Sequence, residues 1–290
     1  MFVATLIANP SRRPLDRAAV EALRDAWGGG TARWLAPGTA AEFDLPAVPA
    51  DARDAWAGLQ GLGFDLCWQP AAGRRKALLL ADMDSTMIEQ ECIDELADVA
   101  GVGAEVAAIT RRAMNGELDF EGALRERVAL LAGLPESAIA EVLDRRITHT
   151  PGGATLVATM RANGGYCALV SGGFTAFTGP VAAALGFDEH RANRLVIAAG
   201  RLAGRVEEPI LGRAAKVAAL DDLCARLGIG PERAMAVGDG ANDLGMLKAA
   251  GAGVALHAKP AVQAEVSLRV NHGDLTALLY LQGYAAADFA

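Results

Sequence analysis

The spacing of hydrophobic positions changes character near residue 76. Before that point, short apolar stretches and one helix-period segment are separated by Gly- and Pro-containing turns. The predicted elements are strands at Phe2–Ala8 and Thr31–Leu35 and helices at Asp16–Trp27 and Asp51–Leu59, with a Pro- and Ala-rich connection at Pro37–Pro49. We therefore expect residues 1–70 to form a small α+β module, followed by a linker at Pro70–Arg75.

From Lys76 onward, short apolar runs alternate with helix-period segments. Ala77–Ala81 is a continuous apolar run that ends on acidic residues, which is typical of a buried parallel strand. Further strands are predicted at Tyr166–Val170, Ala234–Val237, Gly253–Leu256 and Ser267–Val270, and helices at Ala154–Asn163, Phe174–Leu185, Ala214–Leu227 and Asp243–Ala250. This alternation predicts an α/β fold, a doubly wound parallel sheet with helices on both faces.

Two segments interrupt the alternation. Between about residues 88 and 148 only helix-period segments occur, which predicts a helical insertion; they lie at Glu91–Ala100, Ala104–Met114, Phe120–Ala132 and Glu136–Arg145. Later, Ala192–Ala199 and Arg201–Val206 are joined at Gly200 and predict a hairpin.

Composition limits the class of protein. The 290 residues are 52% hydrophobic and 21% charged, which excludes a disordered chain and, at roughly 150 residues per domain, suggests about two domains. The net charge of −8 argues against nucleic acid as the main partner, because such binding needs a basic face, but leaves a small anionic substrate open. No apolar run approaches the ~20 residues of a membrane span.

Cysteine and histidine add little chemistry. The cysteines lack the spacing of a zinc or redox pair, so we expect buried thiols and a cytoplasmic protein without a signal peptide; they are Cys67, Cys92, Cys167 and Cys224. The histidines are scattered and receive no catalytic role; they are His149, His190, His257 and His272.

Two polar clusters directly follow predicted strands in a way that suits phosphate chemistry. Asp82 and Asp84 lie two residues apart, so both carboxylates can converge on Mg²⁺, or one can attack phosphorus while the other handles protons. Ser171 and Gly172 offer a hydroxyl and bare amides at a helix start, which favours a bound phosphate. Each cluster alone is equally compatible with an ordinary solvated turn.

Two further clusters lie nearer the C-terminus. Lys216 stands early in a helix, where the helix dipole disfavours a cation, so an anion is expected to face it. The run from Gly238 to Asp243 contains Asp239, which can complete a metal site, together with Asn242. Because ligands bind outside the carboxyl ends of strands in open α/β sheets, we expect all four clusters to share one site.

The order and strand context of these clusters resemble the haloacid dehalogenase superfamily over residues 74–290. Within this superfamily, three runs of residues are similar to the phosphoserine phosphatase family. They are Asp82-Met83-Asp84-Ser85-Thr86, Arg111-Arg112-Ala113-Met114-Asn115-Gly116 and Leu124-Arg125-Glu126-Arg127-Val128. The resemblance implies a Rossmann-like core with a helical cap at about residues 88–148. It also implies a Mg²⁺-dependent enzyme that hydrolyses the small molecule O-phospho-L-serine.

The resemblance further implies a role for each candidate residue. Asp82 is the nucleophile and Asp84 the acid and base; Mg²⁺ is held by Asp82, the main-chain carbonyl of Asp84, and Asp239. The remaining roles follow by motif position: Ser171, Gly172, Lys216 and Asn242 for the phosphoryl group, Asp243 as their support, Glu91 and Arg127 for the amino and carboxylate groups, and Met114 and Phe120 for the pocket wall.

Three alternatives stay open at this point. A phosphotransferase of the same fold that passes the phosphoryl group to an alcohol such as homoserine shares the first half-reaction. A signalling receiver also carries acidic residues and a lysine, but the aspartate pair and the helical insertion argue against it. The N-terminal module is compatible with an amino-acid-binding regulatory unit of the ACT kind or with a packing or oligomerisation role.

Overall fold

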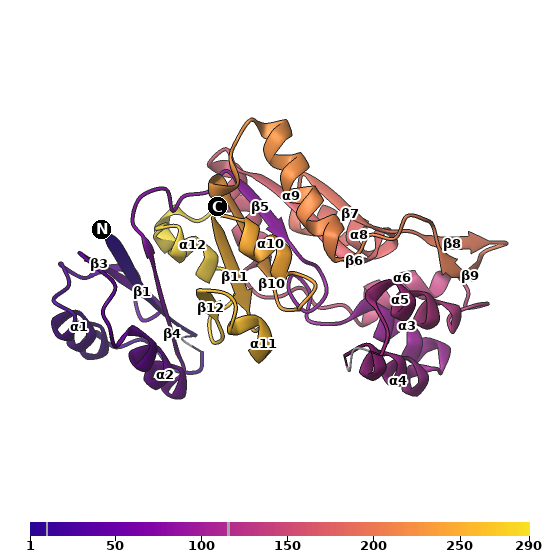
Figure 1. The fold of residues 1–290 in the computed structure, drawn as a ribbon, viewed down its shortest axis with the longest axis horizontal. Helices are drawn as coiled ribbons and strands as arrows, with labels where there is room; N and C mark the ends of the chain where they lie inside the picture. The colour runs from indigo at the N-terminus through magenta and orange to yellow at the C-terminus, as the bar shows by residue number, and fades with distance from the viewer. Residues whose placement is uncertain (10, 115–116) are drawn as a thin grey trace.

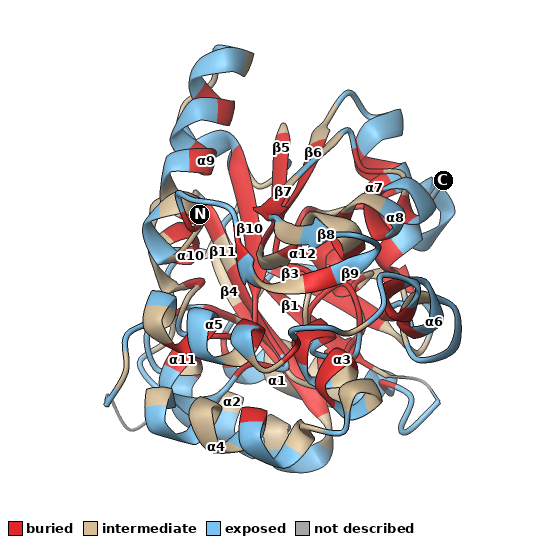
Figure 2. Ribbon diagram, turned by 90° about the vertical axis from the view of Figure 1, so that its right-hand side faces the viewer, coloured by how far each residue is buried: buried red, intermediate tan, exposed pale blue. Residues whose placement is uncertain are grey.

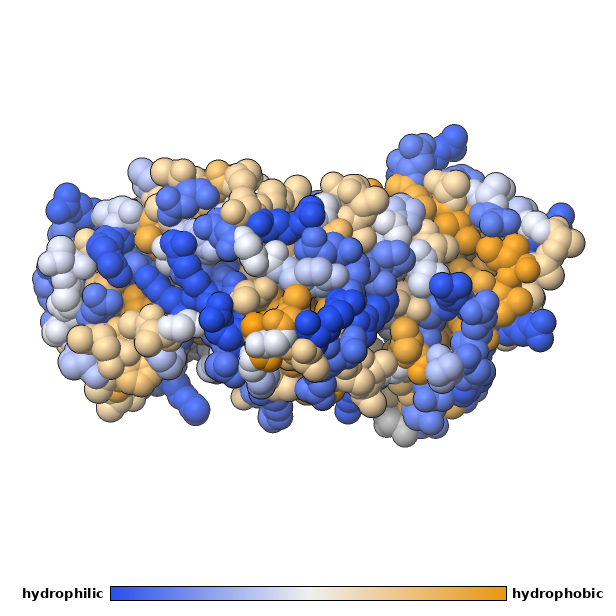
Figure 3. Space-filling model, turned by 90° about the horizontal axis from the view of Figure 1, so that it is seen from above, coloured by the Kyte–Doolittle hydropathy of each residue, from blue (hydrophilic) through white to orange (hydrophobic). Residues whose placement is uncertain are grey.

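The computed structural model describes residues 1–9, 11–114 and 117–290. Three parts lie in a row along the long axis: an N-terminal module, a central domain and a helical cap (Figures 1 and 3). Asn115 and Gly116, which complete one of the motifs named above, lie outside the described residues.

The central domain is built on a six-stranded sheet in the order β12-β11-β10-β5-β6-β7, and every strand pair in it is parallel. The strands are β5 (Leu78–Ala81), β6 (Tyr166–Phe174), β7 (Glu189–Asn193), β10 (Ala234–Gly238), β11 (Ala252–Leu256) and β12 (Leu268–Val270). The predicted parallel α/β fold is confirmed, and Figure 2 shows β5, β6 and β10 of this sheet as largely buried.

Alternate residues of the strands point into two separate cores. Leu79 and Ala81 pack in one cluster, whereas Leu78 and Leu80 pack in the other, so both faces of β5 are covered. Helices cover the sheet on both sides; they are α7 (Gly153–Ala162), α8 (Thr175–Leu185), α9 (Arg213–Leu227), α10 (Leu244–Ala249), α11 (Pro260–Gln263) and α12 (Ala277–Leu281). This arrangement is the doubly wound architecture that the sequence predicted.

The cap draws on two parts of the chain. Its helices are α3 (Cys92–Ala100), α4 (Gly103–Met114), α5 (Phe120–Ala129) and α6 (Ser137–Arg145). The hairpin β8 (Leu195–Ala198) and β9 (Arg201–Val206) packs against them: the N–H of Leu202 donates to the carbonyl of Leu134 at 2.9 Å, and the carbonyl of Leu202 accepts the N–H of Gly133 at 2.8 Å. The cap therefore includes a hairpin that follows the Ser171 and Gly172 cluster in sequence.

The predicted hairpin joined at Gly200 is present, but its first arm begins at Leu195 and not at Ala192. Ala192 and Asn193 instead end β7, the edge strand that pairs in parallel with β6. Strand β7 was not predicted because its sequence begins with the polar residues Glu189-His190-Arg191. Such residues fit a strand at the edge of the sheet, where they stay in contact with solvent.

The N-terminal module is a four-stranded antiparallel sheet in the order β2-β3-β1-β4 with two helices. Its elements are β1 (Phe2–Ala8), α1 (Arg17–Ala26), β2 (Arg33–Ala36), β3 (Ala40–Leu45), α2 (Ala52–Leu62) and β4 (Phe64–Pro70). Strand β3 lies inside the stretch that the sequence analysis treated as a connection, and β4 was not predicted. Ile7 and Cys67 belong to the same buried cluster as the residues of α12, so the module shares a core with the central domain.

Two short 3-10 turns, η1 (Pro231–Arg233) and η2 (Ala286–Asp288), complete the elements. Within the described ranges, none of the helices combines the length and the apolar character needed to cross a bilayer.

Candidate active site

The strand order brings the predicted clusters to one edge of the sheet. Strand β5 lies between β10 and β6, with Ala81 opposite Val237 and Leu169 in the parallel registers. The N–H of Asp82 donates to the carbonyl of Val237 at 3.0 Å and so extends the ladder past the end of β5. Asp82 and Asp239 therefore directly follow β5 and β10, and Ser171 lies near the carboxyl end of the adjacent strand β6, at the edge that the sequence predicted.

Lys216 is the buried cation of this edge. It lies in the first turns of α9 and is only 2% exposed, and its Nζ is 2.7 Å from Oδ1 of Asp82 and 2.6 Å from Oδ1 of Asp243. Burial by itself would lower the pKa of Lys216, but the two carboxylates outweigh burial and raise it above its ordinary value. The lysine is thus a fixed positive charge beside Asp82.

Asp243 serves as a brace for that lysine. Its Oδ1 accepts from Lys216, and its Oδ2 accepts from the N–H of Gly240 at 3.0 Å, so both oxygens already have partners. Gly238 is required beside it, because a Cβ there would lie 2.4 Å from Cγ of Asp243. Burial and then the charge of Asp82 raise the pKa of Asp243 to about 7.

Three carboxylates lie close enough to hold a cation. Within the described residues, oxygen atoms of Asp82, Asp239 and Asp243 lie within 4.8 Å of one another. Burial, followed by the charges of Asp82 and Glu91, raises the pKa of Asp239 to about 6, and the charges of Lys259 and Lys216 only partly oppose this effect. An all-oxygen set with excess negative charge fits a hard divalent cation. Because both oxygens of Asp243 are engaged, Asp82 and Asp239 are the better placed ligands.

Asp84 lies at the junction of the site and the cap. Its Oδ1 accepts the N–H of Cys92 at the start of α3 at 3.1 Å. Burial, then the charge of Glu91, raises the pKa of Asp84 to about 7. A Cβ on Gly173 would lie 2.8 Å from Oδ2 of Asp84 and 3.1 Å from Oγ of Ser171, so the glycine permits these two side chains to approach. A carboxyl that titrates near neutrality suits both donation and acceptance of a proton.

The loop that carries Ser171 and Gly172 is held in place by a residue that was not predicted from the sequence. Asn193 is 2% exposed, and its Nδ2 donates to the carbonyl of Gly172 at 2.8 Å while its Oδ1 accepts from the N–H of Leu211 at 2.7 Å. The amide therefore ties the loop of Ser171 to the segment that leads into Lys216. Asn193 lies at the carboxyl end of β7, so a prediction of that strand from the sequence would have marked Asn193 as a candidate site residue. Asn242 lies across the site, with Nδ2 3.5 Å from Oδ2 of Asp82.

The cap contributes Phe120, Glu91 and Arg127 to the same region. A Cβ on Gly172 would lie 2.9 Å from Cζ of Phe120, so this ring packs directly against the loop that carries Ser171 and Gly172. Glu91 accepts from Oγ of Ser85 at 2.7 Å. Arg127 is half-buried, where burial lowers its pKa and the charges of Asp94, Glu91 and Asp84 oppose that effect.

Met114 is the one described candidate that lies apart. It is 71% exposed at the end of α4, and the structure does not bring it against the other site residues.

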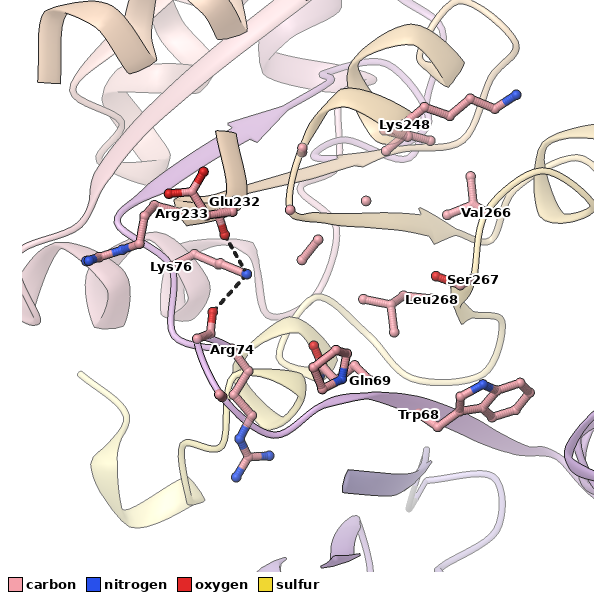
Figure 4. Close-up of a pocket in the computed structure, with 18 of the residues that line it drawn as sticks. Trp68, Gln69, Arg74, Lys76, Glu232, Arg233, Lys248, Val266, Ser267 and Leu268 are labelled. Atoms are coloured by element: carbon pink, nitrogen blue, oxygen red, sulfur yellow. Dashed lines mark hydrogen bonds between the residues drawn. The ribbon is translucent and has the colours of Figure 1, made fainter. Parts of the chain in front are cut away.

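Cavities show where the open space lies. A cavity of about 250 Å³ borders Phe120, Gly212 and Ala214 at the seam between the cap and the central domain. Another, of about 550 Å³, lies between β4 and the amino edge of the central sheet. In the second, Lys76 already donates to the carbonyls of Gly73 and Glu232, and Arg74 points away (Figure 4). Of the candidate site residues, Phe120 alone lines the cavity at the seam, and none of them lines the cavity beside β4.

Comparison with known proteins agrees with this geometry. A family model described as haloacid dehalogenase-like hydrolase matches residues 79–248, the span that carries the groups from Asp82 to Asp243. A phosphoserine phosphatase of Albidiferax ferrireducens is 49% identical over 209 residues, which cover 70% of this chain and 88% of the relative. A phosphoserine phosphatase of Streptomyces coelicolor is 44% identical over 251 residues, covering 85% of this chain and 61% of that longer protein.

Solved structures extend the likeness to the whole chain. A haloacid dehalogenase family hydrolase from Salmonella enterica serovar Typhi has a TM-score of 0.87 at 32% identity and covers 97% of this chain and 98% of its own. A substrate-bound phosphoserine phosphatase has a TM-score of 0.67 at 40% identity over 71% of this chain and 98% of its own. The chain belongs to the haloacid dehalogenase-like hydrolases and, within them, to the phosphoserine phosphatase family. The resemblance predicted from the motifs is confirmed, and the protein is a phosphatase.

Proposed function

We propose that this enzyme hydrolyses O-phospho-L-serine to L-serine and phosphate through an aspartyl phosphate on Asp82, the last step of serine biosynthesis. The observation that carries the proposal is the buried Lys216 between Asp82 and Asp243, with Asp84 titrating near 7 beside them. The names of the relatives support the substrate.

Asp82 is prepared as a nucleophile by its surroundings. Lys216 and the N–H of Met83, which donates at 2.8 Å, both engage Oδ1. These two contacts fix the rotamer of Asp82, so Oδ2 is the oxygen available to phosphorus. As the Oδ2–P bond forms and the ester O–P bond breaks, the leaving serine oxygen takes the proton of Asp84. Water then attacks phosphorus, gives a proton to Asp84, and releases Asp82.

Charge on the phosphoryl oxygens is balanced by this chain's own donors. We assign Lys216, the hydroxyl of Ser171, the N–H of Gly172 and Asn242 to that role, because Lys216 and Asn242 contact Asp82, and Ser171 and Gly172 lie near the carboxyl end of the neighbouring strand β6. Positioning and charge neutralisation are the main demands of phosphoryl transfer.

We further propose Mg²⁺ as the cofactor, held by Asp82, Asp239 and the main-chain carbonyl of Asp84. The donor set is all oxygen, and three carboxylates, those of Asp82, Asp239 and Asp243, lie within 4.8 Å of one another. When bound, the cation would neutralise negative charge on the phosphoryl group and on these carboxylates.

Recognition of the serine moiety is assigned to the cap. Arg127 is half-buried among carboxylates, so it offers a partly desolvated cation for the substrate carboxylate, and Glu91 offers a carboxylate for the amino group. Phe120 closes the seam over Gly172 and excludes water, and Met114 would join the pocket wall only if α4 moved.

The experiment is phosphate release from O-phospho-L-serine by metal-free enzyme, with and without added Mg²⁺, using O-phospho-D-serine as the stereochemical comparison. We expect release that depends on Mg²⁺. Absence of release under both conditions would overturn the proposal. Transfer to an alcohol such as homoserine is not favoured by any relative named above, and an added acceptor would reveal it as an alkyl phosphate product.

The setting of the enzyme is also a proposal. We place it in the cytoplasm, since Cys67, Cys92, Cys167 and Cys224 are all free and buried. Residues 1–70 are assigned as a separate module from the phosphatase domain at 74–290. An ACT-like regulatory role and oligomerisation are both retained for the module, and neither nucleic acid nor a membrane is proposed as a partner.

A further inference from the structure

The N-terminal module meets the central domain along two strand edges. Strand β4 runs beside β12 without pairing to it in a ladder, and the thiol of Cys67 donates to the carbonyl of Arg269 at 3.4 Å. Unpaired strand edges leave backbone N–H groups that need acceptors. A single side chain of the module accepts three such N–H groups in the loop that follows β12.

That side chain is Asp65, which is completely buried. Its Oδ1 accepts from the N–H of Asn271 at 2.8 Å, and its Oδ2 accepts from His272 at 3.0 Å and Gly273 at 2.8 Å. Three charge-assisted hydrogen bonds from consecutive amides fix the loop after β12 onto the module.

The same loop holds the segment that follows β11. The carbonyl of Gly273 lies 2.9 Å from Nε2 of His257, and since a carbonyl only accepts, the imidazole donates. His257 has a φ of 44°, a left-handed conformation uncommon for residues other than glycine, so the surroundings hold its backbone in place. Two residues further on, the N–H of Lys259 donates to the carbonyl of Asp239 at 3.2 Å.

We infer that Asp65 and His257 are positioning residues for Asp239, so that the N-terminal module braces the metal-binding loop. Hydrogen bonds link the Asp65 carboxylate to Gly273 and Gly273 to His257, the main chain leads from His257 to Lys259, and a last hydrogen bond joins Lys259 to the carbonyl of Asp239. The inference rests on the proposed function in one respect, the assignment of Asp239 as a metal ligand. It gives the module a task that requires neither an effector nor a second subunit.

The test is the dissociation constant of Mn²⁺ alone for metal-free full-length protein, measured by isothermal titration calorimetry. His257→Asn tolerates the left-handed conformation but shortens the donor, and Asp65→Asn removes an acceptor from the three amides. We expect each to weaken Mn²⁺ binding by about threefold or more, below the ~10–100-fold seen for direct partners of metal ligands. In the double variant the loss should be smaller than the product of the two single losses, because both act through one path.

Matched controls stand on the other side of the sheet. His190 is also exposed, with one ring hydrogen bond, to Thr178 at 2.8 Å, and Asp188 also accepts a backbone N–H, that of Cys167 at 2.8 Å. His190→Asn and Asp188→Asn should leave Mn²⁺ affinity within about twofold of wild type, a band set by the ~0.3–0.5 kcal/mol error of additivity.

Two results would contradict the inference that Asp65 and His257 position Asp239. Wild-type affinity in folded His257→Asn protein would overturn the inference while leaving the proposed function intact, and His257 is exposed, so this variant should fold even if Asp65→Asn does not. If wild-type protein fails to bind Mn²⁺, the metal site of the proposed function is overturned, and the inference with it.

Discussion

The Nζ of Lys216 lies 2.7 Å from Oδ1 of Asp82, and both side chains are almost completely buried. The lysine belongs to α9 and the aspartate follows β5, so only the folded sheet brings them together. This ion pair is the point on which the stability of the site and its proposed chemistry depend together.

Replacing that lysine should be costly to stability. Lys216→Met leaves Asp82 and Asp243 buried without a cation, and we expect the free energy of unfolding to fall by about 3–5 kcal/mol at pH 8 in urea denaturation. The loss should be smaller at pH 5, where the stranded carboxylates can take up protons. Lys248→Met is the control, because Lys248 pairs with Glu265 in solvent and should cost less than about 1 kcal/mol. Equal losses for the two variants would contradict the account.

Metal-free enzyme should lose stability as pH rises. Asp84 and Asp243, with pKa values of about 7, and Asp239, at about 6, are all raised above the unfolded value of 3.8. Their contribution is fully present below pH 4 and is lost as pH rises through 6–7. Asp239→Asn lacks one of these groups, so its melting temperature in EDTA, relative to wild type, should increase between pH 5 and 8. A difference that is independent of pH would contradict the assignment.

Arg127 should control specificity for the carboxylate of the substrate. Arg127→Ala removes one charge-assisted contact, worth about 1.5–3 kcal/mol, so kcat/KM for phosphoserine should fall roughly 10- to 150-fold. The value for phosphoethanolamine, which lacks the carboxylate, should change little. Arg125→Ala, on the same helix but exposed and paired with Glu208, is the matched control. Equal losses for both substrates would remove Arg127 from this role.

Asp84 should matter most where the leaving group needs a proton. Asp84→Asn should lower kcat for phosphoserine by about 10²–10⁴-fold, the usual contribution of general acid–base catalysis. With p-nitrophenyl phosphate, whose leaving group needs no proton, stopped flow should show one equivalent of nitrophenol released rapidly before slow turnover. Wild-type steady-state rates on both substrates would show that Asp84 is not the proton carrier.

Much of the fold was predictable because its strands are buried on both faces. Leu78–Ala81 and Ala234–Gly238 are continuous apolar runs, and polar residues at their ends marked the edge where the site lies. Strand β3 and strand β7 were not predictable in the same way. The first contains Glu42, whose carboxylate is buried only because Arg74 and Arg33 reach it from elsewhere, and the second is a polar edge strand.

The residues of the candidate site also differ in how far the sequence predicts them. Residues that follow strand ends, such as Asp82 and Asp239, are read from local pattern, since parallel strands end at a common edge. Asn193 and Asp65 act through backbone groups of segments far away in sequence, and no local pattern announces such contacts. The share of the cap formed by the β8–β9 hairpin was hidden for the same reason.

The most direct measurement is the site of phosphorylation during turnover. Wild-type enzyme and the Asp84→Asn variant are mixed with ³²P-labelled O-phospho-L-serine, quenched in acid within milliseconds, and mapped by peptide mass spectrometry. The account predicts acid-stable, hydroxylamine-labile label on Asp82 of the wild-type enzyme, and slower labelling of the variant, because loss of the Asp84 proton slows departure of the serine oxygen. Label on any other residue, or undiminished phosphate release by Asp82→Asn, would contradict it.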